Sequence, residues 1–229
     1  MVVALQSEAR TLLPQADLLR GATLAVGASL ALRLCGMGPE RAAEAARALL
    51  ADGATALVSY GLAGALAPEL APGTLLLPER VVFRGGDRVV DLPWRRRIEQ
   101  RLSPRPAAGL LLTLPQPLAT AADKARAYRE TGVAAVDMES GAVLDVAAAA
   151  GVPALVLRAV VDGAATSLPR AAVAGVDAYG RPRAAALLGA LLRRPWECVD
   201  LLRLSGDLRL ALHSLKRAWS QLGPEGLAA

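Results

Sequence analysis

The apolar residues of this chain come in runs of strand length that alternate with helical patterns, and this order restricts the fold more than any other feature. Strand-like runs occur at 2–4, 22–26, 30–34, 55–60, 74–83, 110–114, 134–138 and 154–162. Helical patterns occur at 39–52, 121–131 and 139–150, and the last two end at Gly132 and Gly151. Because several runs are continuously apolar, we expect strands covered on both faces. The predicted fold class is α/β, a single domain with a mixed, mostly parallel central sheet flanked by helices.

The chain length and its C-terminal charge bear on domain organisation. A chain of 229 residues suits one domain spanning 1–229, ending in a basic helical tail at about 195–222. Helices are expected at 183–193 and 207–221, after a Gly-, Pro-, Ser- and Ala-rich loop at 163–182 of the kind that forms lids. The net charge of +5 is concentrated late in the chain, on either a solvated helix face or a surface for anionic membranes.

Composition excludes several classes of function. An aromatic content of 3% argues against a platform that stacks nucleic-acid bases. Cys35 and Cys198 lack a neighbouring cysteine, and His213 is the sole histidine, so disulfides, zinc and histidine catalysis are not expected. Without a basic and then apolar leader, and without an uninterrupted membrane-spanning run, a cytoplasmic location is expected. We predict no metal and no organic cofactor.

Polar and glycine-rich residues stand where the predicted strands end, which is the edge at which α/β sheets bind ligands. These features are Glu8, CGMG at 35–38, SYGLAGAL at 59–66, AVDMES at 135–140 and Asp162. Glycines let the backbone approach a ligand closely, and burial at a strand end can raise an aspartate pKa enough for acid chemistry. Each feature also has a structural interpretation, because acidic residues suit a first helical turn and glycines suit turns. Neither glycine loop is a Walker or Rossmann fingerprint.

Taken together, these motifs resemble the purine nucleoside phosphorylase and 5′-methylthioadenosine nucleosidase superfamily across almost the entire chain. The resemblance is carried by ALQSEAR, CGMG, SYGLAGAL, AVDMES and LRAVVD, in that order. Within the superfamily, residues 119–140 and 193–204 are similar to the hopanoid-associated branch, adenosylhopane phosphorylase or nucleosidase. The resemblance implies an enzyme that cleaves the N-glycosidic bond of a 5′-substituted adenosine, adenosylhopane, and releases adenine by phosphorolysis or hydrolysis.

The resemblance also implies roles for individual residues. Asp162 would be the acid that protonates the purine at N7, which makes the base a better leaving group. Glu139 would accept hydrogen bonds from the ribose hydroxyls and stabilise positive charge on the sugar, and Met138 would pack on the sugar. Asp137 would cap or brace the turn. Backbone contacts to the substrate would come from Ser59, Gly61, Gly64, Gly36 and Gly38.

The nucleophile is left open by the same comparison. Glu8 stands where nucleosidases of the superfamily carry a water-activating glutamate and where phosphorylases tend to carry an arginine. Leu62 replaces a serine that contacts phosphate in many relatives. Hydrolysis is therefore at least as well supported as phosphorolysis, although phosphate stays possible as a co-substrate. Phosphate could be bound by Arg10, Arg33 or Arg84, and the sequence does not choose among them.

The branch resemblance implies partners as well. A nucleoside linked to a lipid needs an apolar channel on the 5′ side, with walls from the segments after Asp162, and would benefit from peripheral membrane association through the basic tail. Relatives suggest a homo-oligomer. Two other functions stay open, a 5′-methylthioadenosine/adenosylhomocysteine nucleosidase and a non-catalytic nucleoside- or lipid-binding protein. The combination of Glu8, Glu139 and Asp162 argues against the second of these, because a binding protein needs no acid.

Overall fold

The structure is a computed structural model that describes residues 1–14, 22–181, 183, 193–194 and 196–228. Its described strands are β1 (Val2–Val3), β2 (Thr23–Val26), β3 (Leu30–Leu34), β4 (Leu57–Ala65), β5 (Leu75–Leu76), β6 (Arg80–Phe83), β7 (Gly86–Val89), β8 (Leu110–Thr113), β9 (Ala135–Asp137) and β10 (Ala154–Asp162). Its described helices are α1 (Gln6–Leu12), α2 (Pro39–Ala51), α3 (Leu92–Arg101), α4 (Ala121–Thr131), α5 (Ser140–Ala150), α6 (Arg170–Ala174) and α8 (Glu197–Gly226).

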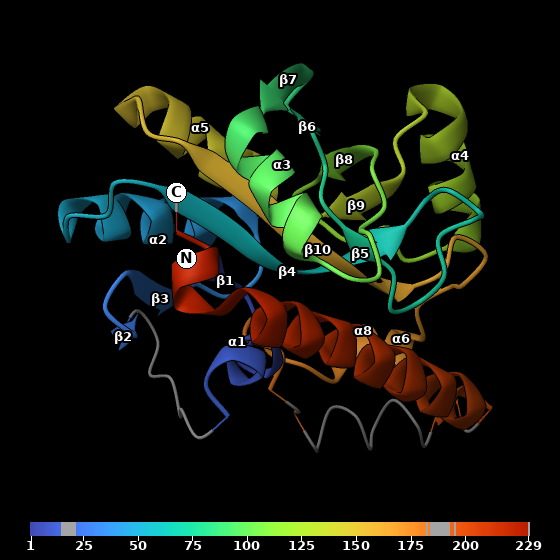
Figure 1. The fold of residues 1–229 in the computed structure, drawn as a ribbon. Helices are drawn as coiled ribbons and strands as arrows, with labels where there is room; N and C mark the ends of the chain where they lie inside the picture. The colour runs from blue at the N-terminus through green and yellow to red at the C-terminus, as the bar shows by residue number, and fades with distance from the viewer. Residues whose placement is uncertain (15–21, 182, 184–192, 195, 229) are drawn as a thin grey trace.

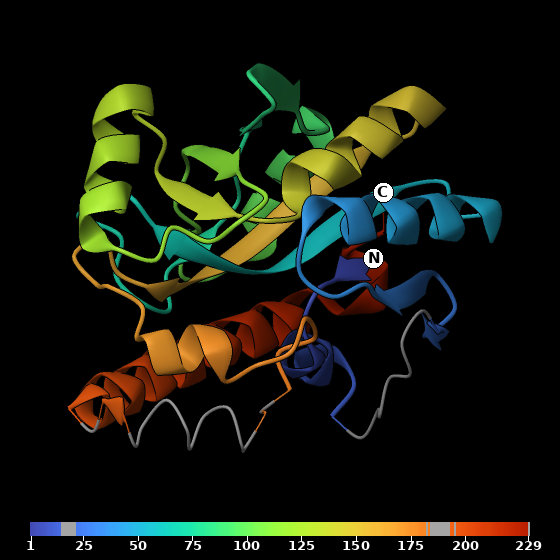
Figure 2. The ribbon, with the colours of Figure 1, turned by 180° about the vertical axis from the view of Figure 1, so that it is seen from behind.

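One mixed sheet runs through the molecule, and helices cover both of its faces (Figure 1). Helices α1, α3 and α8 pack on one face, and α2 and α5 pack on the other, which Figure 2 shows from behind. On β10, Leu155 and Leu157 point into the core beneath α8, while Val156 and Val160 point into the core beneath α5. Because both faces of the strand are buried, its sequence is continuously apolar. The α/β class and the mixed, mostly parallel sheet are as predicted.

The sheet divides at the end of β4, and this division creates the functional edge. β10 runs parallel to β4 along most of its length, with Leu155 opposite Val58 and Asp162 opposite Gly64. The short β9 pairs antiparallel with the last residues of β4, Gly64 and Ala65. The ends of β4, β9 and β10 therefore meet, and the polar residues that follow them are brought together.

Several expected elements differ from those observed. The single strand predicted at 74–83 is two strands, β5 and β6, separated at Leu77–Glu79, with Pro78 unable to donate a ladder hydrogen bond. The hairpin strand β7 and helix α3 were not predicted, and the loop at 163–182 contains the short helix α6. Helix α8 begins ten residues before the predicted 207, since packing against α1 and β10 outweighs the cost of Gly206. The helix predicted at 183–193 lies largely outside the described residues.

No helix in the described parts of the chain is both long enough and apolar enough to cross a lipid bilayer.

Gly141, in the first turn of α5, is required by close packing against β6. A Cβ atom built on Gly141 would lie 2.4 Å from Phe83 Cβ and 2.5 Å from Phe83 Cγ. We predict that Gly141→Ala lowers the free energy of unfolding by about 1–3 kcal/mol, the usual cost of overpacking. The control is Gly206→Ala in α8, where a Cβ would meet nothing within 4 Å. Urea titrations that show equal stability for the two variants would contradict this packing.

Candidate active site

A cavity of about 400 Å³ opens where β4, β9 and β10 end. Five of the nine sequence-predicted site residues line it, namely Glu8, Gly64, Met138, Glu139 and Asp162. Most of the remaining wall is apolar, and part of it comes from the loop after β10, from α6 and from α8, through Leu168, Ala172, Val176, Leu204 and Leu208. The segments after Asp162 thus contribute part of the apolar wall of this cavity.

Glu8 is held in a fixed position at one side of the cavity. It lies in the first turn of α1, and its side chain turns back to accept hydrogen bonds at Oε2 from the amides of Ala4 and Leu5, both at 2.9 Å. Its other oxygen, Oε1, accepts from the amide of Leu62 at 2.9 Å. Burial raises the pKa of Glu8, while Arg158 and the three amides oppose that shift. The result is an oriented, desolvated carboxyl group of the kind that serves as a general base.

Arg158, in the middle of β10, is the buried cation beneath the cavity. Its Nη2 lies 2.6 Å from Asp137 Oδ2 and 3.6 Å from Glu139 Oε2, and its side chain is 1% exposed. The same nitrogen donates to the hydroxyls of Ser59 at 2.8 Å and Ser140 at 3.0 Å. Glu8, Asp137 and Glu139 form a carboxylate cluster around this one guanidinium, and their formal charge exceeds that of the arginine.

The pKa of Glu139 is raised by its burial and by this excess of negative charge. Its Oε1 accepts a hydrogen bond from the Gly38 amide at 3.0 Å, and the backbone there has a φ of 110°, which favours glycine. Burial raises the pKa of Glu139 to about 7, opposed by Arg158 and reinforced by Asp137 and Glu8. Asp137 braces the turn by accepting from the Ser140 amide at 3.0 Å. Both carboxylates of AVDMES line the cavity, and Asp137 also fixes the backbone of the turn.

Asp162 lies at the other side of the cavity and pairs with a buried lysine. Lys124, from α4, makes an ion pair with Asp162 Oδ2 and donates to the carbonyl of Gly163 at 2.9 Å. Burial raises the pKa of Asp162, and Lys124 opposes the shift. Asp162 is thus a buried carboxyl group whose acidity depends on one neighbouring cation, which is how proteins prepare a general acid.

The other predicted site residues lie close to the cavity without lining it. Ser59 is fully buried beneath it and binds Arg158. Gly61 has no room for a side chain, because a Cβ would lie 2.4 Å from Arg158 Nη1 and 2.5 Å from Glu8 Oε1. Gly36, with a φ of 83°, and Gly38 form the turn whose amide reaches Glu139. These residues position the charged groups, and direct contact with a substrate remains a prediction for them.

Sequence reasoning missed Arg158 and Lys124. Arg158 had a detectable signal, since a charged residue inside the apolar strand ALVLRAVVD requires a buried partner. Lys124 had none, because it is one of several charged residues along α4.

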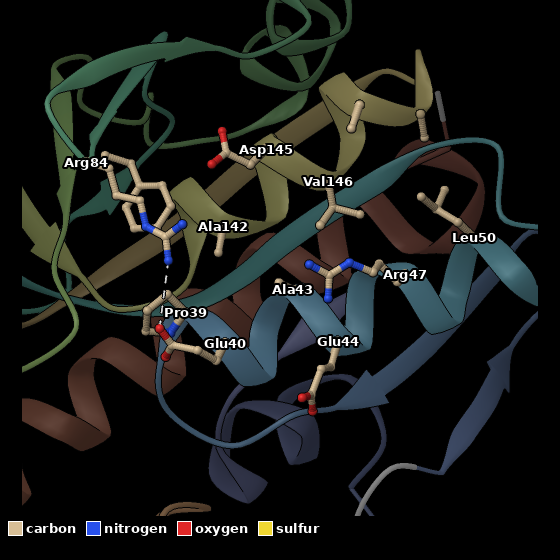
Figure 3. Close-up of a pocket in the computed structure, with 13 residues that line it drawn as sticks. Pro39, Glu40, Ala43, Glu44, Arg47, Leu50, Arg84, Ala142, Asp145 and Val146 are labelled. Carbon is tan, nitrogen blue, oxygen red and sulfur yellow. Dashed lines mark ion pairs between the residues drawn. The ribbon is translucent and has the colours of Figure 1, made fainter.

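The three arginines considered for phosphate binding are not among the residues that line the cavity. Arg33 lies near Asp52, with 3.9 Å between Nη1 and Oδ2. Arg84 lies in a separate hollow between α2 and α5, where it faces Glu40 (Figure 3). Among the described residues that line the cavity, the cation is Lys124, and it pairs with Asp162. In the described ranges, no group of three His, Cys, Asp or Glu side chains is arranged to hold a metal ion.

The family model described as "Phosphorylase superfamily" matches residues 18–193 of the chain. A methylthioadenosine/adenosylhomocysteine nucleosidase from Neisseria meningitidis, solved with methylthio-immucillin-A, aligns at a TM-score of 0.70 and 17% identity, covering 96% of this chain and 95% of that one. Futalosine hydrolase of Helicobacter pylori aligns at 0.65 and 15% identity, covering 96% of each. At these identities the structural likeness establishes the fold. No curated protein sequence gives a significant match.

The raised pKa of Glu139 predicts how stability depends on pH. The folded chain keeps this proton until about pH 7 and the unfolded chain releases it near 4.5, so the folded state binds more protons between these values. The free energy of unfolding should therefore fall as the pH rises through this window, and Glu139→Gln should remove that part of the slope. The control is the exposed Glu44→Gln. Urea titrations at several pH values that give identical slopes for wild type and Glu139→Gln would contradict the assignment.

Proposed function

The chain belongs to the phosphorylase superfamily, and on that premise we propose that it is a nucleosidase that hydrolyses the N-glycosyl bond of a 5′-substituted adenosine and releases adenine. The observation that supports hydrolysis most strongly is Glu8, a carboxyl group fixed by three amides at the cavity wall. A carboxylate there suits a water nucleophile and repels phosphate. None of the three candidate arginines lines the cavity to offset that repulsion.

The chemistry begins with the departure of the base. Asp162 donates a proton to purine N7 as the C1′–N9 bond breaks, and the bonding electrons move into the purine ring. The ribosyl group gains positive charge as the bond breaks. Glu139, at the adjoining wall, accepts hydrogen bonds from the ribose hydroxyls and stabilises that charge, while Met138 contacts the sugar.

The second half of the reaction belongs to Glu8. Its carboxylate takes a proton from a water molecule as the water oxygen bonds to C1′, which gives the free sugar. Arg158 stabilises the ionised form of Glu8 by charge attraction, because both side chains lie against Gly61. The two carboxyl groups thus act on opposite sides of the scissile bond.

The apolar wall supports a hydrophobic 5′ substituent. Leu168, Ala172, Leu204 and Leu208 provide surface that a free 5′ hydroxyl would not use. We propose adenosylhopane as the substrate, with its triterpenoid extending along this wall. A second candidate is a 5′-methylthioadenosine/adenosylhomocysteine nucleosidase, which the cavity volume of about 400 Å³ favours because it lies near the lower end for small-molecule sites.

The proposed function is tested by adenine release in phosphate-free buffer. The substrates are 5′-methylthioadenosine, S-adenosylhomocysteine and detergent-solubilised adenosylhopane. We expect wild type to release adenine, most rapidly from adenosylhopane, and Glu8→Gln and Asp162→Asn each to lose about 10²–10⁴-fold in kcat. The exposed Glu44→Gln should retain full activity. Binding of all three nucleosides without release would instead indicate a non-catalytic binding protein, and release that needs phosphate would indicate a phosphorylase.

We also propose peripheral membrane association through the first half of α8. Exposed apolar side chains gather there, with Val199 55% exposed, Leu202 71%, and Trp196, directly before the helix, 65%. The exposed Arg203 and Arg209 lie on the same stretch, which suits an anionic lipid surface. The opposite side of this helix contributes Leu204 and Leu208 to the cavity, so docking would bring a lipid-linked nucleoside to the site.

Membrane association is tested by co-sedimentation with vesicles that contain phosphatidylglycerol at low salt. The double variant Trp196→Ser, Leu202→Ser should bind at least about 100-fold more weakly, because each inserted apolar side chain contributes roughly 1.5–3 kcal/mol and about 1.4 kcal/mol is tenfold in affinity. The control is Val89→Ser, which removes an equally exposed apolar side chain from β7. Absence of wild-type binding, or equal binding by the two variants, would contradict the proposal.

A further inference from the structure

Lys124 is a buried cation that the proposed chemistry has not yet used. Its side chain is 1% exposed, it lines the cavity, and its ammonium group is committed to Asp162 and to the carbonyl of Gly163. A buried ion pair is a poor device for stability alone, because desolvation of both charges offsets their attraction. The position of this pair, at the wall that holds the acid, points to a role in the reaction.

The backbone around Lys124 is fixed to the loop that carries Asp162. Thr120 caps α4 by accepting the Asp123 amide at 3.0 Å, so the first turn is well defined. The Ala121 amide donates to Ser167 Oγ at 3.0 Å, and the Leu168 amide donates to the Ala119 carbonyl at 2.8 Å. These bonds join the start of α4 to the segment after β10, so the ammonium group and the carboxylate keep a fixed relation.

We propose that Lys124 is a positioning residue that holds the carboxyl group of Asp162 toward the purine and increases its acid strength. This inference rests on the proposed function. When Asp162 transfers its proton to N7, its O–H bond breaks and a buried carboxylate forms, while the C1′–N9 bonding electrons pass to the purine. Lys124 stabilises the carboxylate as it forms.

The physical reason is a balance between two requirements on an acid. Burial favours the protonated form of Asp162, so the proton is available, but burial alone also makes the group reluctant to release it. Asp207 acts in the same direction as burial. A cation in contact with the carboxylate restores the acid strength that adenine, a poor leaving group, requires. A leaving group that departs without protonation has no such requirement.

The test compares two leaving groups in Lys124→Met. With 5′-methylthioadenosine we expect kcat to fall about 10²-fold, near the lower limit for general acid catalysis. With 4-nitrophenyl β-D-ribofuranoside, whose phenolate leaves unprotonated, kcat should stay within about twofold. The pH at which adenine release declines on the alkaline side should move upward, because Asp162 keeps its proton longer without the cation. Lys124→Arg, which preserves the charge, should recover part of the activity.

Three controls separate this role from a structural one. Arg129→Met removes an exposed cation from the same helix and should leave both substrates unaffected. Lys124→Met should cause no further loss of kcat when Asp162→Asn is already present. Because this double variant removes both buried charges, its circular dichroism spectrum and unfolding curve should be those of a folded chain. These curves are measured for every variant.

Equal losses on the two substrates in Lys124→Met, or no loss on either, would overturn the role of Lys124 while leaving the proposed function in place. Further loss from Lys124→Met in the Asp162→Asn background would also overturn it. A wild-type protein that releases adenine from none of the nucleosides would overturn the proposed function, and the role of Lys124 with it.

Discussion

The guanidinium of Arg158, buried among Glu8, Asp137 and Glu139, is the interaction on which the site depends. Three ionised carboxyl groups cannot be buried together without a cation between them. Without the cation, each carboxylate would take up a proton, because burial disfavours its charged form. Arg158 extends from β10 and reaches residues from α1, β9 and the start of α5. It therefore joins the elements that surround the cavity and determines which of the carboxyl groups can ionise.

The charges at the cavity are divided into two groups, to which the proposed mechanism gives separate functions. On the side that the proposal assigns to the sugar, Arg158 is shared by several carboxyl groups. Burial raises the pKa of Glu139 to about 7, and the negative charges of Asp137 and Glu8 reinforce this shift. On the side that the proposal assigns to the base, Lys124 pairs with the carboxylate of Asp162 and donates to the carbonyl of Gly163. An oxocarbenium-like transition state needs negative charge near the sugar and a proton near the purine, and this division supplies both. The same sheet edge can then bind a neutral substrate and stabilise the separated charges of its transition state.

The sequence predicted most of the fold and three of the carboxyl groups that line the cavity, Glu8, Glu139 and Asp162. Continuous apolar strands such as 154–162 indicated a sheet covered on both faces, and AVDMES indicated a strand end carrying functional carboxylates. Helix α3 was missed because its sequence, LPWRRRIEQR, is mostly polar, and its buried residues are Trp94 and Ile98 together with the charged Arg95. Lys124 could not be found, since nothing in the charge pattern of α4 distinguishes the one lysine that turns inward. Its partner lies 38 residues away in the chain, and only the folded structure brings them together.

The identity of the sugar product tests the central claim, that Glu8 and Arg158 prepare water rather than phosphate for attack. The measurement is phosphorus NMR of the reaction of 5′-methylthioadenosine with wild-type protein in saturating phosphate, with adenine release followed in parallel. We predict that adenine accumulates while the phosphate resonance keeps its full intensity, because the sugar is released as the free 5-methylthioribose. A sugar 1-phosphate resonance that grows in proportion to adenine would contradict the account and show that the cavity binds phosphate despite Glu8.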